Sequence, residues 1–106
     1  VRAARIGVVD GTRLLADARS VVAGRLPGTP AYVHLDVDVC DPQEFAAVSC
    51  PVPVGPRAAT VAAALAAIAA HHDVVGVGVC EYAPSVAHDV GVLHRLLGAL
   101  GLTAAC

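Results

Sequence analysis

The chain has 106 residues, which limits it to one domain. Hydrophobic residues make up 57% of the sequence and aromatic residues only 3%, so we expect a core of Ala, Val and Leu. The net charge is -2, and the seven cationic residues are scattered arginines, which argues against nucleic-acid binding. No apolar run reaches the roughly 18 residues of a membrane span, and no signal peptide is visible. We therefore expect a cytoplasmic protein with no membrane contact.

The cysteines indicate neither a disulfide framework nor a zinc motif. They stand at positions 40, 50, 80 and 106, with no Cys-x-x-Cys pair. We expect reduced thiols that act as small buried hydrophobes, as is usual in a cytoplasmic α/β protein.

Apolar residues alternate along the chain between runs typical of strands and spacings typical of helices. The expected elements are a strand at 6–9, a helix at 14–24, a strand at 31–37, a helix at 58–70, a strand at 74–80 and a helix at 85–100 with Ser85 as N-cap. Because connections between strands are right-handed crossovers, we expect the three strands to be parallel.

Residues 34–42, His-Leu-Asp-Val-Asp-Val-Cys-Asp-Pro, place three carboxylates at the end of an apolar strand. Side chains alternate across a strand, so Asp36 and Asp38 should share a face, and His34 should lie on it too. Carboxylates in such a dry strand are costly unless they are paired or bound to a cation. A divalent ion that prefers oxygen, such as Mg, Mn or Ca, would remove the repulsion. The alternative is a solvated turn in which Asp41-Pro42 stops the strand.

A further acid, Glu81, follows the strand at 74–80. The carboxyl ends of parallel strands meet at one edge of a sheet, so Asp36, Asp38 and Glu81 should gather there. Residues 38–56, between the second strand and the next helix, hold four prolines and show no periodicity. Long irregular loops in compact domains are usually functional, so the acids and the loop together predict a site.

Three motifs resemble those of one family, the arginase/agmatinase ureohydrolases. Residues 32–42 are similar to the family's second metal signature, with its Asp-x-Asp-x-x-Asp-Pro core. Residues 51–55, Pro-Val-Pro-Val-Gly, resemble its Pro-x-Pro-Gly-Gly loop, and residues 74–84 resemble its Val-Val-Gly strand that ends in Glu-x-x-Pro. The resemblance covers about residues 31 to 97.

The resemblance implies a three-layer α/β/α domain around a parallel sheet, with a site for two manganese ions. By this match Asp36 and Asp38 would be metal ligands and Glu81 would hold the guanidinium group of a small substrate. Asp41 would brace the loop or line the site wall, and His34 would be a wall residue. A metal-bridged hydroxide would attack the guanidinium carbon and release urea and an amine.

The family's remaining ligands lie in a Gly-x-His and an Asp-Ala-His-x-Asp segment, and neither occurs in this sequence. Two aspartates do not fill the shells of two near six-coordinate ions. We therefore expect residues 1–106 to be a single α/β unit, the C-terminal part of an arginase-like domain without its N-terminal half. Such a chain would be inactive alone and would need that half or form a homo-oligomer.

Two alternatives remain open at the level of sequence. One is a non-catalytic relic or assembly domain of the same fold. The other is a haloacid-dehalogenase-like phosphatase, because residues 36–39 fit the Asp-x-Asp-x-(Thr/Val) motif. That enzyme class needs a downstream Lys or Arg and an acidic pair for magnesium, but the chain has no Lys and its later aspartates, Asp73 and Asp89, lie far apart in sequence.

Overall fold

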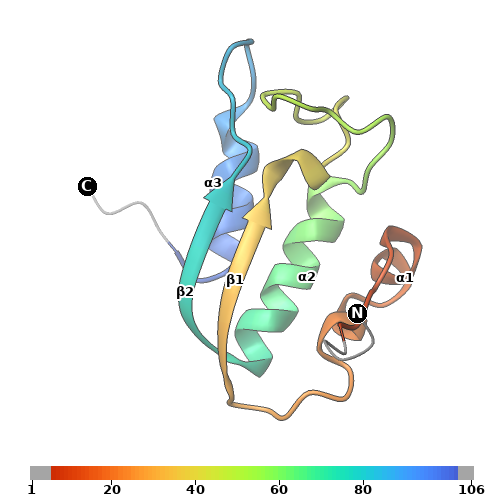
Figure 1. Cartoon of the computed structure of the whole chain (residues 1–106), viewed down its shortest axis with the longest axis vertical. Helices are drawn as coiled ribbons and strands as arrows, with labels where there is room; N and C mark the ends of the chain where they lie inside the picture. Colours follow the sequence, from red (N-terminus) through yellow and green to blue (C-terminus); the bar gives the residue numbers. More distant parts are fainter. Residues whose placement is uncertain (1–5, 103–106) are drawn as a thin grey trace.

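The computed structural model describes residues 6–102, and a two-stranded parallel sheet with helices beside it forms its frame (Figure 1). The elements in chain order, with η marking 3-10 helices, are α1 (Gly11–Ala16), η2 (Ala18–Val22), β1 (Pro30–Asp36), η3 (Val37–Val39), α2 (Ala58–His71), β2 (Asp73–Cys80) and α3 (Val90–Ala99). The helix α2 lies on the crossover between β1 and β2, as a parallel pair requires.

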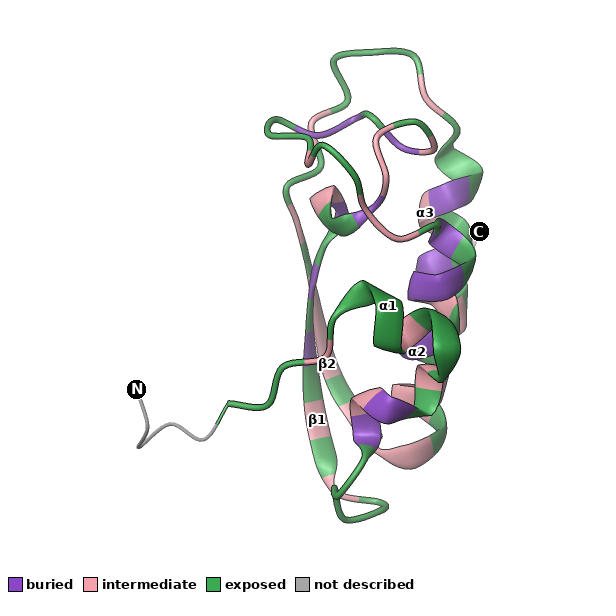
Figure 2. Cartoon of the chain, turned by 90° about the vertical axis from the view of Figure 1, so that its right-hand side faces the viewer, coloured by how far each residue is buried: buried purple, intermediate pink, exposed green. Residues whose placement is uncertain are grey.

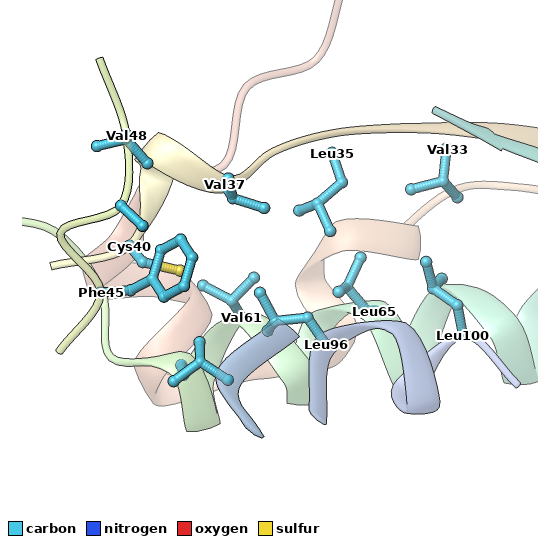
Figure 3. Close-up of a cluster of buried hydrophobic side chains, with 13 residues drawn as sticks. Val33, Leu35, Val37, Cys40, Phe45, Val48, Val61, Leu65, Leu96 and Leu100 are labelled. Atoms are coloured by element: carbon cyan, nitrogen blue, oxygen red, sulfur yellow. The ribbon is translucent and has the colours of Figure 1, made fainter. Parts of the chain in front are cut away.

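The helices α2 and α3 cover one face of the sheet (Figure 2). Alternation along β1 turns Val33 and Leu35 toward these helices, where they approach Leu65 of α2 and Leu96 of α3 (Figure 3). The buried cluster comprises Val33, Leu35, Val37, Cys40, Phe45, Ala47, Val48, Ala58, Val61, Leu65, Val92, Leu96 and Leu100. Aliphatic side chains and Ala dominate it, as the composition predicted.

The N-terminal expectations were wrong in two respects. Residues 6–9 form no strand, and Val8 is 84% exposed, because no described strand lies beside this segment to pair with it. The helix expected over 14–24 is divided into α1 and η2. Asp17 causes the break: it adopts an extended conformation and its carboxylate accepts a hydrogen bond from the Arg19 backbone N–H, which starts a new turn.

In the C-terminal half, α2 and β2 confirm the expected helix and strand to within one residue at each end. The last helix begins later than expected, at Val90 rather than after Ser85. Its N-cap is Asp89, whose carboxylate accepts a hydrogen bond from the Gly91 backbone N–H at 2.8 Å. Residues 81–89 are instead a loop beyond the carboxyl end of β2.

The described residues thus form two layers, a helical layer and a parallel sheet, which is consistent with the partial α/β fold that was expected. The second face of the sheet carries Tyr32, His34 and Asp36, all of which are exposed. Among residues 6–102, no helix combines the length and apolar character that a membrane span requires.

Candidate metal and substrate site

Two of the acidic residues singled out in the sequence, Asp36 and Asp38, lie at the carboxyl end of β1. Asp36 is the last residue of β1 and is exposed, whereas Asp38 is half-buried in η3. The argument from strand alternation was therefore wrong for Asp38, because the strand ends one residue after Leu35 and the chain tightens into a 3-10 turn. Both aspartates still flank the end of the strand.

His34 and Asp36 lie on the uncovered face of β1, as the alternation predicted. The Nε2 atom of His34 lies 2.8 Å from Oδ1 of Asp36, which makes the pair a hydrogen bond or, with a protonated ring, an ion pair. More than half of the His34 side chain and nearly half of the Asp36 side chain are exposed to solvent. The contact therefore lies in solvent, where it adds little to the stability of the fold.

Glu81 reaches the same edge of the sheet from the neighbouring strand. In the parallel register Asp36 lies opposite Cys80, so Glu81 is the first residue beyond the paired region. It is exposed, and its φ of 69° makes it the only non-glycine residue with a left-handed backbone among residues 6–102. Such a conformation is unfavourable for a glutamate and persists only where the surroundings hold it, a condition common at functional sites.

The loop segment around Glu81 is held by contacts on its C-terminal side. Tyr82 forms an antiparallel bridge with Val48, and its ring stacks on Phe45 with ring centroids 6.1 Å apart. Its hydroxyl donates to Nε2 of His88, because the Nδ1–H of that ring is used on the Val86 carbonyl. These contacts supply the restraint that the backbone of Glu81 needs.

Asp41 lies in the loop after η3, and its carboxylate is bonded to backbone N–H groups. Its carboxylate accepts hydrogen bonds from the backbone N–H groups of Gln43, at 2.9 Å, and Gly55, at 3.3 Å. These bonds, the one from Gln43 foremost, hold the pKa of the Asp41 carboxyl below its usual range. The second bond joins the two ends of the segment 38–56, called here the Pro-rich loop.

Sequence reasoning missed Cys80 as a member of this region. Donor atoms of His34, Asp36 and Cys80 all lie within 4.8 Å of one another, and they are the only such group of three potential metal ligands within residues 6–102. Cys80 is half-buried and Cys50 is exposed, so the expectation of buried thiols was wrong for both. Its place beside Asp36 follows from the register of β1 with β2, in which Gly78 pairs with His34 and Cys80 with Asp36.

Cys40 does fit the expectation of a buried thiol. It is 1% exposed within the core cluster, and burial, with a smaller contribution from the negative charge of Glu44, raises the pKa of its thiol. Cys40 is therefore a packing residue, unlike Cys80.

Comparison of the sequence with known protein families gives a match over nearly the whole chain. The sequence model of the Arginase family matches residues 4–102. This chain belongs to the arginase family. No curated protein matches it by sequence.

The fold of the arginase family also appears in solved structures that resemble this chain. A hypothetical agmatinase from Burkholderia thailandensis is 25% identical, with a TM-score of 0.63 over 90% of this chain and 30% of its own. Proclavaminate amidino hydrolase from Streptomyces clavuligerus is 24% identical, with a TM-score of 0.69 over 93% of this chain and 34% of its own. Arginase from Medicago truncatula is 24% identical, with a TM-score of 0.57 over 88% and 29%. The chain thus spans about a third of the length of these structures.

Membership of the family confirms the resemblance seen in the three motifs and the arginase-like α/β class. The match gives no support to the phosphatase alternative. The two layers described above are the part of that fold which residues 6–102 contribute.

Proposed function

We propose that this chain contributes metal ligands and a substrate carboxylate to a ureohydrolase, which cleaves a guanidino compound to urea and an amine. The observation that carries the proposal is the parallel register of β1 with β2 in a chain matched by the arginase family. That register brings Asp36 and Glu81 to one edge of the sheet, where open α/β sheets bind their ligands.

The donor atoms at the end of β1 are of the type that manganese prefers. Asp36 and Asp38 offer carboxylate oxygens, the donors that Mn²⁺ prefers, and the exposure of Asp36 leaves it accessible to an ion. When bound, two such ions would activate water toward the guanidinium carbon. Asp36 and Asp38 would hold them, and further ligands have to come from polypeptide outside these motifs, because two carboxylates do not complete two octahedral shells.

Glu81 would bind the substrate rather than the metal. A guanidinium group presents planar N–H donors to which a carboxylate can bond in pairs. Glu81 lies one residue beyond the end of β2, and its left-handed backbone is fixed by the Tyr82 contacts. Its side chain therefore extends from a fixed backbone position and can bind a cation that enters from solvent.

Substitution of the acids tests the proposal in the natural gene product, with manganese-dependent urea release from arginine and agmatine as the readout. Asp36→Asn and Asp38→Asn should each lower this activity by about 100-fold or more, above the usual effect of losing an outer-shell partner. Glu81→Gln should raise KM without lowering the manganese content. Asp73→Asn is the matched control, since Asp73 is an exposed aspartate at the opposite end of β2.

Wild-type turnover in the Asp36 or Asp38 variant would contradict the ligand roles, and loss of manganese from Glu81→Gln would contradict the substrate role. The same assay on the 106-residue chain alone should give no urea, for want of ligands. If the natural gene product neither binds manganese nor releases urea, the non-catalytic alternative replaces this proposal.

A further inference from the structure

The group His34, Asp36 and Cys80 has a donor chemistry that the proposed manganese site does not use. It combines an imidazole nitrogen, a carboxylate oxygen and a sulfur, all within 4.8 Å of one another. Manganese prefers oxygen-rich sites, whereas a sulfur ligand favours softer ions such as Zn²⁺. We propose that these three residues form a binding site for a thiophilic divalent cation, with Zn²⁺ as the representative ion.

The backbone of the sheet places the three donors. His34 and Asp36 are two residues apart on β1 and share its uncovered face, and Cys80 lies opposite Asp36 in the parallel register. The residue opposite His34 is Gly78, and the hydroxyl end of the Tyr32 ring lies where a Gly78 side chain would stand. Sites carried by paired strands hold their ligands more firmly than sites on loops.

The aromatic ring of Tyr32 occupies the rest of this face of β2. A Cβ atom on Gly76 would lie 2.8 Å from Cδ2 of Tyr32, and Gly78 likewise has room for the tyrosine only because it lacks a side chain. The ring thus covers the two glycines, and the next position along this face is Cys80. The donor group therefore lies between an aromatic ring and the open carboxyl end of the sheet.

The spacing suits tetrahedral zinc. Zinc lies about 2.0–2.3 Å from nitrogen, oxygen and sulfur ligands, so tetrahedral donors stand roughly 3.4–3.7 Å apart. His34 and Asp36 are closer than this, at 2.8 Å. The donor atoms are at most 4.8 Å apart, so rotation of the side chains has to bring them together by no more than about 1 Å. Three protein ligands and a water would complete four-coordination, and the exposed face admits both ion and water.

Binding has a simple proton balance. The Cys80 thiol loses its proton to solvent as the sulfur becomes a ligand. His34 binds as the neutral imidazole with its one proton on the ring nitrogen that does not ligate, so only a protonated ring would release a further proton. No electron is transferred and no other reactant is needed. The inference does not depend on the proposed function, because His34 and Cys80 have no ligand role there, but the two sites share Asp36.

Cobalt and zinc titration of the reduced 106-residue chain tests the proposal. Co²⁺ should produce a near-ultraviolet charge-transfer band from thiolate to cobalt together with the visible bands of a four-coordinate ion, and Zn²⁺ should abolish both by displacement. Cys80→Ser should remove the charge-transfer band and weaken Zn²⁺ binding in calorimetry at least about tenfold. His34→Gln should weaken Zn²⁺ binding to a similar degree while the charge-transfer band remains at higher cobalt.

Two matched controls locate the site. Cys50→Ser removes an exposed thiol outside the group, and His94→Gln removes an exposed imidazole on α3, so both should bind Co²⁺ and Zn²⁺ like the wild type. Circular dichroism checks that each variant is folded. The proposal is overturned if the wild type shows no charge-transfer band, if Cys80→Ser keeps it, or if Cys50→Ser loses it.

Manganese calorimetry on the natural gene product separates this inference from the proposed function. Cys80→Ser should leave Mn²⁺ affinity unchanged while it weakens Zn²⁺, whereas Asp38→Asn should weaken Mn²⁺ and spare Zn²⁺. An equal loss of both ions in Cys80→Ser would refute a separate zinc site.

Discussion

At the scale of single residues, Gly55 and Asp41 fix the Pro-rich loop that follows β1. The Asp41 carboxylate accepts from the Gly55 backbone N–H, and the Asp41 backbone N–H donates to the Pro56 carbonyl at 3.0 Å. The chain approaches so closely here that a Cβ on Gly55 would lie 2.5 Å from the Val39 carbonyl oxygen and 3.0 Å from the Asp41 nitrogen. Both obstacles are backbone atoms, which cannot rotate away.

Gly55→Ala should therefore destabilise the chain by about 1–3 kcal/mol, the usual cost of forcing an extra methyl group into a packed position. The matched control is Gly98→Ala in α3, where a Cβ meets nothing within 4 Å. That control should be stabilised by up to about 1 kcal/mol, because Ala favours helix over Gly. Urea denaturation of the three proteins measures both effects. Equal midpoints for Gly55→Ala and the wild type would show that the loop does not pack as described.

At the scale of elements, the packing of α3 against the sheet holds in place the loop beside the proposed site. Leu96 is fully buried, at 0% exposed, and Figure 3 shows its side chain among those of β1 and α2. The loop that carries Glu81 and Tyr82 connects β2 to this helix. Loss of the helix contact should therefore loosen the substrate side of the proposed site as well as the core.

Leu96→Ala should cost about 2–5 kcal/mol, the range observed for leucines truncated in well-packed cores. Leu15→Ala supplies the control, since Leu15 on α1 is 75% exposed and should change stability by less than about 0.5 kcal/mol. Thermal or urea denaturation compares the two. A loss in Leu15→Ala as large as that in Leu96→Ala would mean that α1 packs in solution against a surface absent from this structure.

Elements with a strong hydrophobic pattern were predictable, and those that depend on a partner were not. The helix α2 and the strand β2 follow directly from composition and an unbroken apolar run. Residues 6–9 have the composition of a strand, but pairing decides whether a strand forms. The position of Asp38 was mispredicted because the 3-10 turn of η3 carries no apolar period of its own. Cys80 joined the acids through the register of two strands, which one strand's sequence does not contain.

At the scale of the whole molecule, the sheet has one bare face within residues 6–102, and each of its two strands has one unpaired edge. Within residues 6–102, β2 pairs with β1 alone, so its other edge offers free N–H and C=O groups. Val75, where the register shifts, is 65% exposed, and Tyr32 is exposed to the same degree. An exposed apolar edge strand is a template for pairing with another chain. We therefore expect the isolated chain to self-associate through β2.

Val75→Lys should weaken this association about 5- to 10-fold, equivalent to about 1–1.4 kcal/mol, because a charged side chain at the edge would have to be desolvated on pairing. Val54→Lys is the matched control: Val54 is a valine of the Pro-rich loop, 80% exposed and outside the sheet. Sedimentation velocity across a concentration series measures the association in all three proteins. If Val54→Lys dissociates the chain and Val75→Lys does not, the loop and not the sheet edge forms the contact. A wild type that stays monomeric at every concentration would contradict the expected self-association.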